Sequence, residues 1–381
     1  MECIHSQVGV SVVDSNGTIL PCCKFTDIGN LPTIFDIDSL DNLHQSYPYH
    51  KIKHDLNNGK WPTGCQTCKV AEQSGTGSRR VWSNKFYKEH NLLHPPAIQD
   101  LEIALDYTCN MRCQICNPSA SSKWGTSAKL LQDLDSAGID YMKNSHYRNY
   151  QDRMKLILSN TDLSQARHIK IEGGEPFYAK HLSWFIDKLH QEVLNPDKLF
   201  LNITTNGSVY PTQQVIRQLE YFRNSGISFS LDGIGKLAEN TRWGVSWETI
   251  DRTIQSFSKT DINLYASCTV SILNFNKLQA LQDYLKHYNI KVSFNELTFP
   301  KHLSIYQLPL SVREQFVTGN SELDRILTAD ITINNQLTTT RDYIDIMDRH
   351  QKTDFRSVNR YVWEIINGLV EINRKHTALS T

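Results

Sequence analysis

Three cysteines stand close together in one short segment, at Cys109, Cys113 and Cys116. Spacings of four and three residues let one loop present all three thiolates to different corners of an iron–sulfur cluster, with one iron left without a protein ligand. A zinc site would take a fourth Cys or His, and no His stands near this segment. The segment therefore indicates a cluster with one open iron, which a cofactor or a substrate can ligate.

A second group of cysteines precedes this segment. Cys22 and Cys23 are adjacent, Cys65 and Cys68 form a Cys-x2-Cys pair, and Cys3 stands near the start of the chain. One thiolate of the adjacent pair, with the other three, would complete the four-ligand shell of a second cluster. We expect Cys22 to be that ligand, with Cys23 as the alternative. Half of a zinc site at Cys65 and Cys68 is a further interpretation.

Charge, composition and cysteine usage exclude several classes of protein. The 381 residues carry 40 basic and 40 acidic side chains, so the totals show no footprint of a nucleic-acid-binding protein. The 39% of hydrophobic residues suffices for a folded core, and no apolar run approaches the roughly 18 residues that cross a bilayer. The odd count of nine cysteines and the absence of a signal-peptide pattern predict a cytoplasmic location.

Strand-like and helical stretches alternate from residue 98 to residue 300, which is typical of repeated βα units around a parallel sheet. The three-cysteine loop follows the first expected strand, at the end where such barrels hold their chemistry. We therefore predict an α/β fold with a partial (β/α)6 barrel. The expected strands are 101–106, 168–172, 199–204, 227–231, 264–272 and 290–295, and the expected helices are 182–194, 212–223, 247–257 and 277–287.

Two further regions flank the predicted barrel. Residues 1–97 carry five of the nine cysteines, and we expect a separate module that begins with a β-hairpin over residues 8–20. Residues 301–381 end in two helical stretches and are expected to form a helical C-terminal extension. The first crossover is too long for one helix, and we interpret its centre, residues 133–150, as a surface loop rather than a flap.

The cysteine loop and four later segments together resemble the radical SAM superfamily, in particular its peptide-maturing branch. Each of the first three later segments ends an expected strand, in the order that the resemblance requires, and the fourth contains an arginine. The segments are Glu172-Gly173-Gly174-Glu175-Pro176, Thr205-Asn206-Gly207, Ser230-Leu231-Asp232-Gly233 and Asn240-Thr241-Arg242-Trp243-Gly244.

The resemblance implies that S-adenosylmethionine binds the open iron of a 4Fe-4S cluster held by the three-cysteine loop. Its reductive cleavage would give a 5′-deoxyadenosyl radical that abstracts hydrogen from a substrate. The superfamily often has an aromatic residue where Ile115 stands, and apolar packing against adenine survives that change. Glycine is expected in the second segment because a Cβ would block the approach of the backbone to the ligand. The implied S-adenosylmethionine contacts are Ile115, Gly173, Gly174, Glu175, Asn206, Ser230, Asp232 and Arg242.

The N-terminal cysteines resemble the twitch domain, which is half of the SPASM auxiliary-cluster module and here would precede the barrel. The resemblance implies an auxiliary iron–sulfur cluster, expected to be 4Fe-4S. Its implied ligands are Cys3, Cys22, Cys65 and Cys68, and Glu72, Gly75, Ser78 and Arg80 fit the same pattern.

The expected function is that of a radical SAM enzyme that modifies a peptide or protein side chain, with an electron donor such as flavodoxin or ferredoxin. Modification of a small metabolite, such as a sugar or an amino-acid derivative, is the alternative, and RNA is less favoured. A metal-binding scaffold is the non-enzyme alternative. We interpret Cys268, within the fifth expected strand, as a small buried hydrophobic residue, with hydrogen donation to a substrate radical as the alternative.

Overall fold

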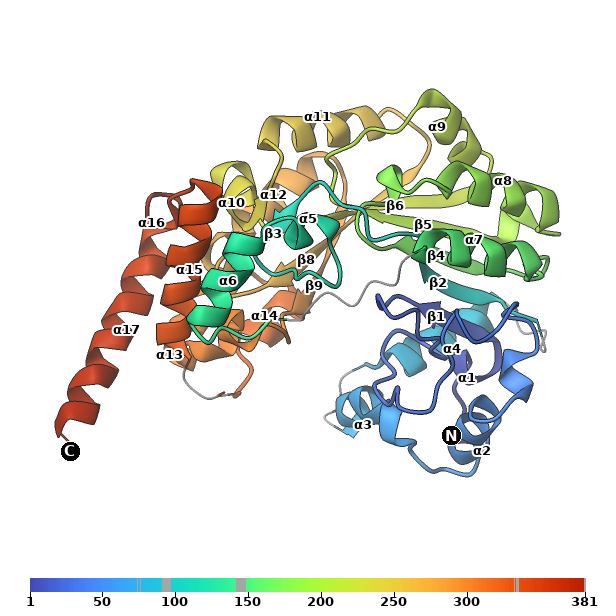
Figure 1. Cartoon of the computed structure of the whole chain (residues 1–381), viewed down its shortest axis with the longest axis horizontal. Helices are drawn as coiled ribbons and strands as arrows, with labels where there is room; N and C mark the ends of the chain where they lie inside the picture. The colour runs from blue at the N-terminus through green and yellow to red at the C-terminus, as the bar shows by residue number, and fades with distance from the viewer. Residues whose placement is uncertain are drawn as a thin grey trace.

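The computed structural model describes residues 1–73, 75, 77–90, 97–141, 149–331, 333 and 336–379, with side chains up to residue 372. Its centre is an all-parallel sheet with the strand order β1-β2-β4-β5-β6-β8-β9 (Figure 1). All expected strands are present, with ends shifted by up to three residues, and β1 is added to them. The strands are β1 (Gly9–Val12), β2 (Asp100–Ala104), β4 (His168–Glu172), β5 (Phe200–Thr205), β6 (Asn224–Ser230), β8 (Asn263–Val270) and β9 (Lys291–Glu296).

The side chains of the central strands divide into two faces, because successive residues of a strand point to opposite sides. Ile171 and Ile203 lie on a helix-packed face and are fully buried. Lys170, Asn202 and Ser228 lie on the opposite face, where they are partly exposed, and we call it the open polar face. The sheet therefore has a solid apolar side and a side that a ligand can reach.

The expected helices after the strands are present, and their apolar sides complete the core. Two of them begin at a side chain that caps the first turn. Thr212 accepts a hydrogen bond from the Val215 amide, and Ser246 accepts one from the Thr249 amide. The helices are α8 (Leu182–Glu192), α9 (Gln213–Glu220), α11 (Trp247–Phe257) and α12 (Leu278–His287).

The described part of the long first crossover contains the helices α5 (Ser122–Gly125), α6 (Ala128–Ser136) and α7 (Tyr150–Asn160). Residues 142–148 of the predicted surface loop lie outside the described residues. The crossover also fastens the N-terminal segment, since the Arg153 guanidinium donates hydrogen bonds to the Ile34 and Ile37 carbonyls at 2.6 and 2.5 Å.

The N-terminal segment joins the main sheet, which the sequence did not predict. β1 pairs in parallel with β2, with Gly9 opposite Asp100. The predicted hairpin is present as one antiparallel bridge between Ser11 and Leu20, and Gly17 in its turn has φ +71°. Among its described residues, this segment is completed by the α-helices α1 (His5–Val8), α2 (Tyr49–Asn57), α3 (Gln66–Gln73) and α4 (Arg79–Glu89).

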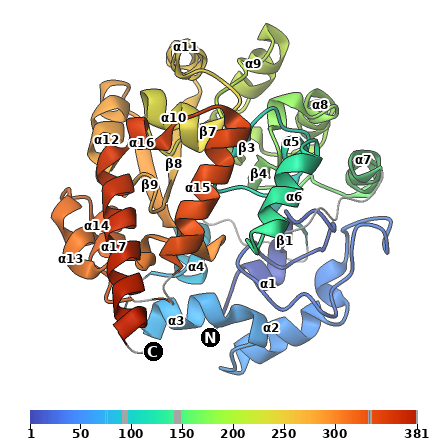
Figure 2. The same cartoon turned by 60° about the vertical axis from the view of Figure 1, so that its left-hand side comes forward.

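Helices dominate the chain after residue 300, as expected. In Figure 2, α15 lies in front of the sheet next to α6, and the two helices pack together. Within the described ranges, no helix is long and apolar enough to cross a membrane. The helices are α13 (Leu310–Arg313), α14 (Ser321–Leu327), α15 (Leu337–Gln351), α16 (Phe355–Val358) and α17 (Arg360–Leu379).

Candidate functional site

The three-cysteine loop leaves the carboxyl end of β2 and contains a short strand, β3 (Arg112–Cys113). β3 pairs antiparallel with β7 (Arg242–Trp243), which places Cys113 opposite Arg242. The Arg242 Nη1 atom lies 4.0 Å from the Cys113 sulfur. A residue about 130 positions away in sequence is thus brought to the loop.

The loop sulfurs are surrounded by N–H groups. The Met111 amide lies 3.4 Å from the Cys109 sulfur, and the Asn206 side-chain amide lies 3.8 Å from it. Burial raises the pKa of Cys109 and raises that of Cys116 to about 11, because a lone thiolate there loses its hydration. N–H donors and a guanidinium are the groups that compensate thiolate charge, so the surroundings of the loop fit an anionic thiolate cluster.

The described part of the chain contains no group of three or more His, Cys, Asp or Glu side chains arranged to hold a metal ion. The thiols of the loop are nevertheless neighbours, since a charge on Cys109 or Cys116 would raise the pKa of Cys113. The ligand roles of these cysteines stay predictions.

Gly173 and Gly174 pack against the backbone of the cysteine loop. The Gly174 amide donates to the Asp106 carbonyl at 3.0 Å. A Cβ at Gly174 would stand 2.3 Å from the Thr108 carbonyl oxygen, and one at Gly173, where φ is +129°, would stand 2.3 Å from that of Asp106. The structure therefore gives a different reason for these glycines from the expected one: they allow two loops to touch.

The carboxylate of Glu175 is 1% exposed and bonds within the protein. It accepts hydrogen bonds from the Thr205 hydroxyl at 2.7 Å, the Asn206 amide at 2.8 Å and the Phe177 amide at 3.2 Å. Burial raises its pKa more than these bonds lower it. Glu175 thus fixes the end of β5, from which Asn206 reaches Cys109, and its predicted contact with S-adenosylmethionine stays a prediction.

Asp232 and Arg242 form a buried ion pair, with 2.7 Å between Oδ2 and Nε. The Asp232 Oδ1 atom also accepts the Thr269 amide at 2.9 Å. The pair holds the guanidinium in one orientation beside Cys113, where it can receive a ligand carboxylate. Two other predicted contacts, Ser230 at the end of β6 and Ile115 in the loop, are partly exposed.

Cys268 lies on the helix-packed face of β8, in the same alternation as Ala266 and Val270. It is fully buried, and its sulfur lies 3.9 Å from the Asn274 amide nitrogen. These surroundings agree with the interpretation as a buried hydrophobic residue and place the thiol away from the open polar face.

Four N-terminal cysteines lie around one small cavity, together with two arginines. Cys23 has different surroundings, because its thiol hydrogen-bonds to the Glu102 carboxylate. The structure thus places Cys22, and not Cys23, at the cavity, and the ligand role of Cys22 stays a prediction. The cavity is lined by Cys3, Cys22, Cys65, Cys68, Arg79 and Arg80, among others.

Sequence reasoning missed a group of charged residues on the open polar face. The Glu102 carboxylate is 1% exposed and contacts Lys170 Nζ at 2.8 Å and Arg79 Nη2 at 3.3 Å. Burial alone would raise the pKa of Glu102, but Lys170 and Arg79 outweigh it and hold the pKa at about 2. The signal was available in the strand Asp-Leu-Glu-Ile-Ala, where acidic and apolar residues alternate.

No known family model matches the chain. The chain is similar to the GTP 3′,8-cyclase of Sulfurovum sp. (strain NBC37-1), with 23% identity over 214 residues that cover 55% of this chain and 58% of that protein. It is also similar to the GTP 3′,8-cyclase of Aliarcobacter butzleri (strain RM4018), with 25% identity over 169 residues that cover 44% of this chain and 45% of that protein. The chain thus spans about half the length of these curated relatives.

Among solved structures, the chain is similar to Streptococcus suis SuiB bound to S-adenosylmethionine, with a TM-score of 0.36, 14% identity, and coverage of 70% of this chain and 56% of that chain. Native anSMEcpe with bound AdoMet gives a TM-score of 0.39 with 14% identity and covers 56% of each chain. No conclusion about this chain follows from likenesses at such TM-scores. The similarity to the curated relatives supports the resemblance to radical SAM enzymes, and with it the expectation of an enzyme. The resemblance of the N-terminal cysteines to a twitch domain stays a prediction.

Proposed function

We propose that this protein is a radical SAM enzyme that abstracts hydrogen from a peptide or protein side chain. The observation that carries the proposal is the convergence on one loop of three thiols, at the carboxyl end of β2, and of a buried guanidinium 4.0 Å from the Cys113 sulfur. The similarity to GTP 3′,8-cyclases supports the reaction class. A reducing cytoplasm and an external one-electron donor, such as flavodoxin or ferredoxin, belong to this proposal.

Each residue of the site has a role in this proposal. Cys109, Cys113 and Cys116 hold the 4Fe-4S cluster. When bound, the cluster and S-adenosylmethionine supply one electron and a carbon-centred radical. Arg242, fixed by Asp232, binds the carboxylate of S-adenosylmethionine.

The remaining predicted contacts shape the space around the cofactor. Gly173 and Gly174 keep the second loop in contact with the cysteine loop. Glu175 holds the end of β5, so that Asn206 stays against Cys109. Ser230 and Ile115 would complete the contacts, with the apolar Ile115 against adenine. These residues orient the cofactor and keep water from it.

An auxiliary 4Fe-4S cluster in a twitch-like domain, residues 1–97, is the second part of the proposal. Its ligands are Cys3, Cys22, Cys65 and Cys68. Arg79 and Arg80 at the same cavity are paired with Glu102 and Glu72 and would offset part of the charge of four thiolates. A complete shell of four thiolates favours electron transfer or a structural role over substrate binding.

Modification of a small substrate is the second candidate function. It is favoured by the name of the curated relatives, GTP 3′,8-cyclase, which states that those proteins act on GTP. The hydrogen-bonding side chains of the open polar face, such as Asn202 and Ser228, suit a polar ligand of that size. Consumption of GTP by the reduced enzyme, with no turnover of candidate peptides, would favour this function.

The proposed function is tested by anaerobic reconstitution, counting of iron and sulfide, and reduction with dithionite in the presence of S-adenosylmethionine. We expect 5′-deoxyadenosine as a product, and its loss in Cys113→Ala. A fully loaded protein that forms no 5′-deoxyadenosine would overturn the proposal.

A further inference from the structure

Helix α15 of the C-terminal extension contacts the backbone of the three-cysteine loop. The Tyr343 hydroxyl donates a hydrogen bond to the Gln114 carbonyl at 2.6 Å. About two helical turns further along α15, the Gln351 side-chain amide donates to the Arg112 carbonyl at 3.2 Å. These carbonyls belong to the two residues on either side of Cys113. The Arg112–Cys113 and Gln114–Ile115 peptide groups are therefore both held by a helix more than 220 residues away in sequence.

The opposite side of the same loop segment is held by β7 and the residue before it. The Gln114 amide donates to the Thr241 carbonyl at 2.7 Å. The Arg112 guanidinium lies over the Trp243 ring, 4.6 Å from its centroid, and the Trp243 indole N–H donates to the Gln351 carbonyl at 3.0 Å. The loop segment is therefore enclosed between β7 and α15, and the two also contact each other.

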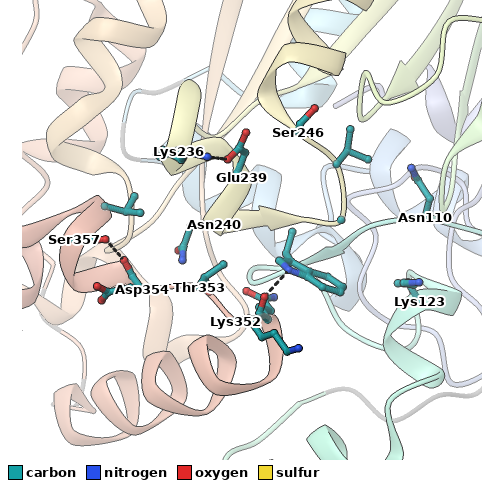
Figure 3. A pocket seen from close by; sticks show the side chains of 15 residues that line it. Asn110, Lys123, Lys236, Glu239, Asn240, Ser246, Lys352, Thr353, Asp354 and Ser357 are labelled. Carbon is teal, nitrogen blue, oxygen red and sulfur yellow. Dashed lines mark hydrogen bonds and ion pairs between the residues drawn. The ribbon is translucent and has the colours of Figure 1, made fainter.

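A cavity of about 710 Å³ opens beside this assembly, between the loop residue Asn110, helix α10 (Gly235–Thr241) and the segment that follows α15 (Figure 3). In Figure 3, Asn110 and Lys123 lie on one side of the cavity, and Thr353 and Asp354 lie on the opposite side. Gln351 and Trp243 line this cavity, whereas Tyr343 and Gln114 lie behind it in the buried core.

Tyr343 is suited to donate a permanent hydrogen bond. Its side chain is 2% exposed, and its ring lies 4.7 Å from that of His302, measured between centroids. Burial, together with the charges that Cys116 and Cys113 would carry, raises the pKa of Tyr343 well above its usual range. The hydroxyl therefore keeps its proton at any working pH, and its only role at this carbonyl is that of a donor.

We propose that Tyr343 is a positioning residue for the cluster of the three-cysteine loop: its hydroxyl fixes the Gln114 peptide between Cys113 and Cys116 and favours the reduced state of that cluster. This inference rests on the proposed function. A hydrogen bond accepted by the carbonyl orients and polarises the peptide group between the two cysteines, and the dipoles and hydrogen bonds around a cluster set its potential. The C-terminal extension is then part of the cluster site.

The test compares Tyr343→Phe with the matched control Tyr306→Phe, both in the full chain after anaerobic reconstitution. Tyr306 is also buried and donates a hydrogen bond of 2.6 Å, to Glu296 and away from the cysteines. The readouts are the midpoint potential of the loop cluster, followed by its electron paramagnetic resonance signal in a Cys65→Ala background, and the rate of iron loss to a chelator.

We expect Tyr343→Phe to load iron normally, to shift the midpoint potential to more negative values and to lose iron about fivefold faster, as for one lost hydrogen bond. Tyr306→Phe should match the parent. Gln351→Met, which removes the donor to Arg112 but keeps the tyrosine, should show a smaller shift in the same direction and gives a second measurement if Tyr343→Phe folds poorly. Potentials and loss rates equal to the parent in both Tyr343→Phe and Gln351→Met would overturn the inference, whereas a parent protein without a loop cluster would overturn the proposed function instead.

Discussion

The two groups of cysteines are built in opposite ways. The three loop cysteines come from eight consecutive residues, and distant segments, β7 and α15, fix the loop around them. The four cavity cysteines come from three separate segments, and two neighbouring arginines of α4 stand beside them. Cysteines in one short segment can therefore be recognised from their spacing, but the distant residues that hold that segment cannot. Cysteines from separate segments come together only when the chain folds.

The charged side chains around the two groups of cysteines are also paired differently. The guanidinium at the loop is already paired with Asp232, so its charge is balanced before any cofactor binds. At the cavity, Arg80 is paired with Glu72, while Arg79 is shared between the cavity and Glu102. The loop thus carries an arginine whose charge is already balanced, whereas the cavity lies next to the charged group of the open polar face.

The largest effect should come from removing one sulfur of each group in turn. Cys113→Ala should lose about four iron atoms per chain and all formation of 5′-deoxyadenosine, because two thiolates do not hold a cubane cluster. Cys65→Ala should lose the auxiliary cluster but still cleave S-adenosylmethionine. Iron counting and chromatography of the product measure both. The reverse result would mean that the roles of the two groups are exchanged.

Gly174→Ala should disturb the three-cysteine loop and leave the cysteines of the N-terminal cavity unaffected. The added Cβ would stand 2.3 and 2.6 Å from the carbonyl oxygens of Thr108 and Tyr107, so we expect a loss of about 3 kcal/mol in unfolding free energy and weak binding of the loop cluster. Urea denaturation and iron content measure these losses. Gly29→Ala is the control, because a Cβ there meets nothing within 4 Å. A stable, fully loaded Gly174→Ala protein would contradict the loop contact.

Acid should lower the stability that the ion pairs of Glu102 with Lys170 and Arg79 give to the fold beside the cysteine cavity. The pKa of Glu102 is about 2 in the folded protein against 4.5 for an unperturbed glutamate, so its stabilising effect is complete above about pH 4.5 and is lost as the pH falls toward 2. Unfolding free energies of the parent and of Glu102→Gln between pH 5 and pH 2, measured with urea, should converge as the pH falls.

The control for this titration is Glu364→Gln, which removes the exposed ion pair between Arg360 and Glu364 on α17. Such an exposed pair is screened by water and contributes little to stability, so this variant should follow the parent at every pH. Equal pH profiles for Glu102→Gln and the parent would show that Glu102 is not held in its charged form by Lys170 and Arg79.

The smallest effect is expected at Cys268, which belongs to neither group. Its thiol is fully buried on the helix-packed face, so Cys268→Ala should cost about 1 kcal/mol of unfolding free energy and leave turnover and product stereochemistry unchanged. Val270→Ala on the same face should cost about 2 kcal/mol. A changed stereochemical outcome in Cys268→Ala would restore the hydrogen-donor role that this position argues against.

The strands and the loop were predictable because their signals are local. Alternating apolar residues and spaced cysteines are read within a few positions, and Ser246 caps α11 as its sequence indicates. The supports of the site were not predictable, because Tyr343 and Gln351 look like ordinary residues of an amphipathic helix until α15 is placed. The sequence also suggested a different reason for a glycine at position 174, because the loop that Gly174 touches is distant in sequence.

The pairing of β1 with β2 makes the first hundred residues hard to remove. A chain that began after residue 97 would leave β2 as a bare edge, with unpaired backbone groups along Leu101 and Ile103. Bare edges of this kind recruit other chains and aggregate. Dissection of this protein into independently expressed halves is therefore expected to yield insoluble material, and the two cysteine groups are best studied by point substitution in the intact polypeptide.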